Sequence, residues 1–189
     1  MGCHRIFLLA AVLVSLFARG TLAQTVPDEP KRNAPEPSQD SLGQAIRAAE
    51  RATGGRARKA ELERERGVDA YEIKTVAKDK SASVVVELAS GKVLRVDGPG
   101  LLESIFDGED RREDQAALAQ LEASPLTLAA ACAAAERETG GRAIEASLKS
   151  RYGQTLFSVG VVKEFALHKV TVDPASGRVV AQQQNKDDN

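Results

Sequence analysis

A dense run of acidic residues is the first part of this sequence that could do chemistry. It includes the carboxylates of Asp107, Glu109, Asp110 and Asp114. Carboxylates on a loop bind Ca²⁺ when they alternate along it and a bidentate Glu completes the set. Neither that alternation nor the terminal Glu is present. We therefore interpret residues 107–114 as a solvated surface loop and assign no metal site.

Cys132 and His168 are the candidates for nucleophilic or metal chemistry. A catalytic cysteine needs a base or cation nearby to form its thiolate, and no histidine stands in a sequence relation to Cys132 that suggests activation. His168 falls on the same side of the predicted strand as Val170 and Val172, which favours a half-buried structural histidine. A histidine without partner ligands does not form a zinc site. We therefore assign no catalytic and no cofactor-binding residue.

Two further features invite an anion-binding interpretation. Gly54-Gly55 could belong to a phosphate loop, but no strand precedes it and no Gly-Lys-Ser/Thr follows it. The basic residues from Arg56 to Arg66 could form an anion-binding strip, but they are interleaved with Glu61, Glu63 and Glu65. Because the local charge nearly cancels, we interpret this segment as a solvated outer strand. The net charge of −1 likewise gives no case for a nucleic-acid or anionic-membrane partner.

These candidates lie in or between two copies of one segment. Gly54-Gly55 recurs 86 residues later as Gly140-Gly141, and residues 41–94 share 21 of 54 positions with residues 127–180 without a gap. Such self-similarity indicates an internal duplication. Cys132 takes the place of Ile46 under this offset, so we expect it to be a small core residue.

The pattern of each copy predicts one helix followed by four strands. The first helix begins with Ser41 as N-cap and ends at Gly54, and the second begins with Thr127 as N-cap and ends at Gly140. Their buried stripes are Leu42, Ala45, Ile46 and Ala49, and Leu128, Ala131, Cys132 and Ala135.

Alternating residues then predict the strands of each copy. In the first copy they are Ala60 and Leu62; Tyr71, Ile73 and Thr75; Val84, Val86 and Leu88; and Val93 to Val96. In the second they are Ile144, Ala146 and Leu148; Phe157, Val159 and Val161; Val170 and Val172; and Arg178 to Ala181. The expected fold class is α+β, with two duplicated units of one helix packed on a small antiparallel sheet.

The N-terminal residues 1–23 have the features of a secretory signal. An apolar run from Ile6 to Phe17 follows Arg5, and Thr21-Leu22-Ala23 suits a cleavage site. A membrane anchor is the alternative, but the run is shorter than the roughly 20 residues needed to span a bilayer. We expect cleavage after Ala23, export to the periplasm and no stable membrane insertion afterwards. The mature chain would keep only Cys132, so it would form no intrachain disulfide.

The remaining segments complete the expected organisation. Residues 24–40 are rich in proline and read as a disordered linker, and residues 182–189 as a disordered tail. Repeat 1 spans 41–96 and repeat 2 spans 126–181. The connector, 97–125, holds the acidic loop, an apolar patch at Leu101 to Phe106 and a short helix from Gln115 to Leu121. Units this small, with few aromatics, seldom fold alone. We expect the repeats to pack as one unit, edge to edge or through their faces.

The two copies resemble the PepSY family, which is named after the propeptides of secreted metallopeptidases. The resemblance rests on a helix ending in Gly-Gly, an aromatic residue at Tyr71 or Phe157, and a strand that runs into Asp173-Pro174-Ala175-Ser176-Gly177. The first copy keeps Ser90-Gly91 but has Glu87 where the family prefers Asp.

This resemblance implies a non-catalytic exported protein with a protein partner. One hypothesis is a binding module that inhibits or regulates a peptidase of the cell envelope. Another is a structural or accessory component of the envelope that binds a protein and inhibits nothing. An undetected enzyme is the third, and the sequence offers it no catalytic constellation. The binding surface, the partner's identity and the oligomeric state stay open.

Overall fold

The computed structural model describes residues 41–65, 67–78, 80–98, 108–151 and 154–184. Repeat 1 contains α1 (Ser41–Thr53), β1 (Arg56–Glu65), β2 (Val68–Ala77), β3 (Lys80–Glu87) and β4 (Val93–Asp97). Helix α3 (Gly108–Ala123) precedes repeat 2, which contains α4 (Leu128–Thr139), β5 (Arg142–Arg151), β6 (Gln154–Lys163), β7 (Ala166–Val172) and β8 (Val179–Gln184). The predicted signal, the linker and the patch at Leu101 to Phe106 lie outside the described residues.

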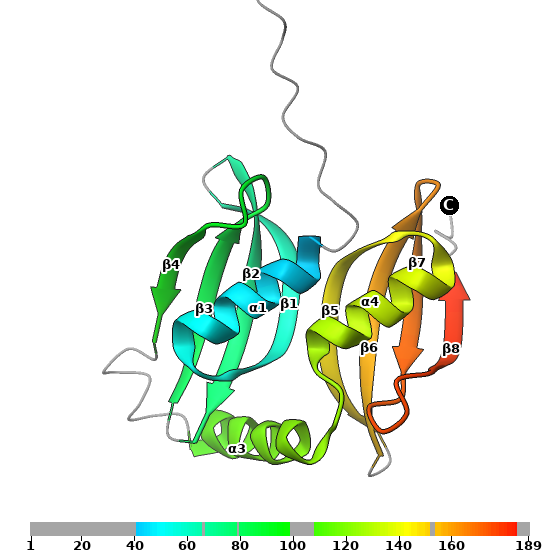
Figure 1. Ribbon diagram of the computed structural model, residues 1–189. Helices are drawn as coiled ribbons and strands as arrows, with labels where there is room; N and C mark the ends of the chain where they lie inside the picture. The colour runs from blue at the N-terminus through cyan, green and yellow to red at the C-terminus, as the bar shows by residue number, and fades with distance from the viewer. Residues whose placement is uncertain (1–40, 66, 79, 99–107, 152–153, 185–189) are drawn as a thin grey trace, which may run out of the picture. The chain divides into compact units, whose positions relative to one another are not determined.

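All eight strands form one sheet in the order β4-β3-β2-β1-β5-β6-β7-β8, with antiparallel pairing throughout. Helices α1 and α4 lie side by side on the same face of this sheet (Figure 1). Buried residues of both helices and both halves of the sheet form a single apolar cluster. The prediction of an α+β fold built from two units of a helix and four strands is therefore confirmed.

The two repeats join edge to edge through β1 and β5. Ala60 pairs with Ala146, and its neighbours pair as Lys59 with Ser147 and Glu61 with Glu145. Ala146 is the counterpart of Ala60 under the 86-residue offset, so each repeat offers the same strand segment to the other. This is the isologous pattern of a two-fold interface, with its pseudo-axis at the alanine pair. The prediction of an outer strand after Arg56 is wrong, because β1 is paired on both sides.

The duplicated Glu-x-x-Thr-Gly-Gly motif builds the junction between helix and first strand. In repeat 2, Oε1 of Glu136 accepts a hydrogen bond from the Ala143 amide at 2.9 Å, and the Thr139 hydroxyl donates to the Ala135 carbonyl at 2.8 Å. The counterparts Glu50 and Thr53 make the same bonds in repeat 1. These side chains therefore hold helix and strand together in both repeats.

The two glycines of that motif have different tasks. Gly54 and Gly140 have φ of +69° and +72° and end their helices, which confirms the predicted caps. Gly55 and Gly141 are needed for close approach instead. A Cβ on Gly141 would lie 2.6 Å from Val161 Cγ1, and one on Gly55 would lie 2.8 Å from the Val76 carbonyl oxygen.

Thr127 caps α4 by accepting a hydrogen bond from the Ala130 amide at 3.1 Å, as predicted. Two other details of the helices and strands differ from expectation. Ser41 is the first residue of α1, and its hydroxyl lies 2.8 Å from that of Tyr71. In β5 the register shifts between Ala143 and Glu145. The predicted inward position of Ile144 is therefore wrong: Ile144 is half-buried, and Ala143 is in the core.

Residues on both sides of repeat 2 are more ordered than predicted. The solvated loop expected at 107–114 is wrong from Gly108 onward, because α3 begins there and Asp114 pairs with Arg58 at 3.1 Å. Helix α3 also buries Leu121 in the core. The tail is wrong in part, since β8 continues to Gln184 and pairs with β7. Polar residues are compatible with an edge strand because backbone bonds to one neighbour hold it.

Candidate functional site

A pocket of about 240 Å³ lies at the C-terminal end of α1 in repeat 1. Its walls come from the last turn of α1, the β2–β3 hairpin and the end of β4, and include Ala52, Ala77, Lys80, Ser81, Ala82 and Val96. Most of these groups are apolar or small, and Lys80 is exposed at the hairpin. The size suits one large side chain, since a cavity of about 150 Å³ already holds a benzene ring.

The pocket exists because repeat 1 carries smaller residues than repeat 2 at the same positions. Ser81 has Leu167 as its counterpart, and Ala82 has His168. The strand registers confirm this equivalence, because Ala82 pairs with Thr75 just as His168 pairs with Val161. Larger residues also replace Ala52, Ala77 and Val96, namely Glu138, Lys163 and Gln182. The two repeats share one backbone arrangement, and the smaller side chains of repeat 1 account for its cavity.

The two threonine hydroxyls that line the pocket already have partners. The Thr75 hydroxyl donates to the Ala82 carbonyl at 3.3 Å. That of Thr53 donates to the Ala49 carbonyl and accepts from the Gly55 amide. No Asp, Glu, His or Cys is among the described residues that line it. With no base next to a hydroxyl, these residues are suited to bind a group rather than to transform it.

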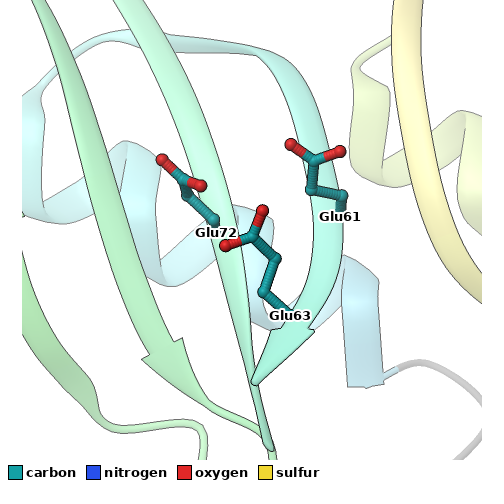
Figure 2. A group of neighbouring side chains, drawn as sticks. All are labelled: Glu61, Glu63 and Glu72. Atoms are coloured by element: carbon teal, nitrogen blue, oxygen red, sulfur yellow. The ribbon is translucent and has the colours of Figure 1, made fainter. Parts of the chain in front are cut away.

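Three glutamates form a second candidate, on the sheet face turned away from α1 and α4. Figure 2 shows Glu61 and Glu63 on β1 beside Glu72 on β2, with the helices behind the strands. A carboxylate oxygen from each lies within 4.8 Å of the others. Lys59 pairs with Glu61, and the Ser83 hydroxyl donates to Glu72. Partial desolvation, with the charges of Glu72 and Glu61, raises the pKa of Glu63.

This trio has the donor atoms for a hard cation such as Ca²⁺. Two of its three carboxylates, however, already have partners within the protein. Exposed acidic groups on neighbouring strands also occur without any ion, so the trio remains a candidate only. The sequence interpretation did not bring these residues together, because Glu72 joins Glu61 only through strand pairing.

Of the residues weighed in the sequence, Gly55 lines the pocket, and Glu61 and Glu63 belong to the trio. Cys132 and His168 lie in neither candidate. Cys132 is fully buried in the core, as its alignment with Ile46 predicted. His168 is half-buried, and its Nδ1 has no hydrogen-bond partner among the described residues. It occupies in repeat 2 the place that is open in repeat 1. Comparing residue sizes between the copies was the available signal for the pocket.

The turn after β7 is also built as its sequence suggests. The Asp173 carboxylate accepts from the Ala175 amide and from the Ser176 hydroxyl, and these bonds lower the pKa of Asp173. Glu87 holds the matching turn of repeat 1 through the Ser90 hydroxyl. Both acidic residues therefore stabilise turns.

No single helix among the described residues is long and apolar enough to cross a membrane. The pair Arg112–Ala123 and Leu128–Thr139 passes by length and composition only when taken together, across a bend of 65°.

Comparison with known proteins gives the family. No curated protein is significantly similar in sequence. The crystal structure of a "putative lipoprotein" from Clostridium difficile 630 aligns at 20% identity over 75% of this chain and 90% of that chain, with a TM-score of 0.46. The family model described as peptidase propeptide and YPEB domain, PepSY, matches residues 41–97 and 125–183. These two matches cover more than half of the sequence, and the chain therefore belongs to the PepSY family and carries two copies of its domain.

Proposed function

We propose that this protein is an exported, non-catalytic binding module that regulates a peptidase of the cell envelope. The observation that carries the proposal is the family match over both repeats, because the family's description is that of a peptidase propeptide. The pocket in repeat 1 agrees with it, since its walls suit the binding of a side chain and contain no activated nucleophile.

The proposed cellular location is the periplasm, with the signal peptide removed after Ala23. The apolar run and the small residues before Gln24 support it. Cell fractionation after osmotic shock should recover the protein in the periplasmic fraction, and mass spectrometry should find Gln24 at its N-terminus. Recovery of the protein in the membrane fraction with residues 1–23 still attached would contradict this location.

The regulatory role can be tested with the mature protein, residues 24–189. Added to a periplasmic extract, it should reduce the hydrolysis of a peptide substrate until inhibition saturates. The matched variant Ala82→His places the residue of repeat 2 at the wall of the pocket and leaves the strand pairing in place. If inhibition is unchanged in this variant, the peptidase binds elsewhere on the protein.

The accessory role is the second candidate and predicts a different outcome. In that case no peptidase activity changes at any concentration of the mature protein, yet the protein still binds a component of the envelope. Cross-linking in intact cells followed by mass spectrometry would identify such a component. A partner found together with unchanged peptidase activity would reject the regulatory role and support the accessory one.

A further inference from the structure

The hairpin between β6 and β7 carries an unusual turn. Glu164 and Phe165, its two central residues, have φ of +49° and +65°. Positive φ at both positions is the type I′ pattern, which favours Asn and Gly and strains larger side chains. Phe165 is also fully exposed, at 106% of its reference area. Within the described part of the chain, Phe165 is therefore strained without being buried against any other residue.

The fold does not require a phenylalanine here. The counterpart positions in repeat 1 are Lys78 and Asp79, a polar pair between the strands of the equivalent hairpin. Two strands of nearly the same lengths are therefore connected in repeat 1 without an aromatic residue. A strained and exposed residue that the fold does not need points to a role outside the molecule's own core.

The pocket of repeat 1 complements this turn in size, polarity and charge. It has room for one aromatic ring, and much of its wall is formed by Ala52, Ala77, Ala82 and Val96. Lys80 stands at the hairpin beside the pocket, where it carries a positive charge. On the turn, Glu164 carries the opposite charge next to Phe165.

A single molecule cannot insert its own Phe165 into this pocket. The pocket lies where β2 ends and β3 begins, and Phe165 lies where β6 ends and β7 begins. Because β1 and β5 are antiparallel, these two hairpins project from opposite ends of the shared sheet. A contact between them needs two copies of the chain.

We propose that Phe165 of one molecule binds in the repeat 1 pocket of a second copy, with Glu164 close to Lys80. Two copies related by a two-fold axis can form this contact twice in a closed dimer. Without that axis the contact is heterologous, and each copy can pass it on to the next in an open chain. One aromatic anchor in one small pocket gives a weak, concentration-dependent association. This proposal uses the same pocket as the proposed peptidase contact, but it is tested on the protein alone, so either proposal can fail without the other.

The test is sedimentation equilibrium of the mature protein, residues 24–189, over a range of concentrations up to the millimolar. The wild type should associate, and Phe165→Ser should weaken the association at least about tenfold. Ala82→His, which places the imidazole of repeat 2 at the wall of the pocket, should do the same. The control Val180→Ser removes an exposed apolar residue from β8 and should leave the association unchanged.

A mixture of the two variants gives the decisive result. Phe165→Ser keeps an intact pocket, and Ala82→His keeps an intact Phe165. Neither should self-associate, but the mixture should form a one-to-one complex through the single remaining contact. Circular dichroism confirms that each variant is folded before it is mixed. A monomeric wild type throughout the range, or association that persists in both variants, would overturn the proposal.

Discussion

The two repeats use the same residues to build their frames and different residues at the ends of their helices. Glu50 and Thr53 make the same helix-to-strand bonds as Glu136 and Thr139. A few residues away, the shared frame encloses a pocket in repeat 1 and larger side chains in repeat 2. The comparison teaches that the frame is a structural requirement of each repeat. The divergent positions, by contrast, are where one repeat gained a property that the other lacks.

Separating the repeats should have the largest effect. Fragments 41–98 and 125–184 each lose part of the common apolar cluster and expose the edge of β1 or β5. We expect neither to unfold cooperatively at the urea midpoint of the intact protein, as measured by circular dichroism. Mixing the fragments should restore part of the lost stability, because their edges are complementary. Cooperative transitions in both fragments at the intact midpoint would show two independent domains.

Gly141→Ala should be the most destabilising of the single changes. Its Cβ would lie 2.6 Å from both Val161 Cγ1 and the Val162 carbonyl oxygen, whereas the closest atom to a Cβ on Gly55 is at 2.8 Å. We expect a loss of about 3 kcal/mol for Gly141→Ala and less for Gly55→Ala. Gly140→Ala is the matched control, because it adds left-handed strain of about 1 kcal/mol and no contact within 4 Å. Urea titrations that rank Gly140→Ala above Gly141→Ala would contradict the close-approach argument.

Removing the junction glutamates should destabilise the protein less, and by different amounts in the two repeats. Glu136 is 7% exposed and accepts a hydrogen bond from the buried Ala143 amide, so Glu136→Ala leaves that donor unpaired. The expected loss of unfolding free energy is about 2 kcal/mol. Glu50→Ala should cost about 1 kcal/mol, because water reaches this half-buried position more easily. Glu136→Gln retains an acceptor and should recover most of the loss in the same urea titration.

Glu63→Gln should have the smallest effect, with the opposite sign. A carboxyl whose pKa is raised in the folded state makes its favourable contribution at low pH and loses it as the pH rises. The neutral glutamine removes repulsion among Glu61, Glu63 and Glu72. It should therefore stabilise the protein at pH 7 by a few tenths of a kcal/mol, roughly. Thermal melts should show this gain at pH 7 and none below about pH 4. Glu122→Gln on α3 is the exposed control, and an equal gain in that variant would mean a general charge effect.

The sequence predicted those features that depend on residue type at a fixed spacing. The helix stripes, the αL glycines and the Thr127 cap follow directly from local geometry. The inner position of β1 was missed because its long charged side chains, such as Lys59 and Glu61, reach water from the open face of the sheet. A strand between two neighbours then looks like one at the edge.

Other features depend on information that one segment does not contain. The bulge at Ile144 changes which side chains face inward but leaves the composition unchanged. Helix α3 was missed in its first half because a dense run of charges suits a solvated helix as well as a solvated loop. The glutamate trio needs the register between β1 and β2, and the pocket needs the sizes of residues from α1, β3 and β4 together.

The pairing of Ala60 with Ala146 has an evolutionary consequence. A strand that pairs with its own counterpart is the arrangement formed by two identical chains, so a single-repeat ancestor could have dimerised in this way before its gene was duplicated and fused. In such a homodimer every mutation appears twice, and both halves must tolerate it. Once the halves share one chain, each can change alone. Ala82 and His168 show the result, since the same strand position holds a small side chain in one repeat and an imidazole in the other.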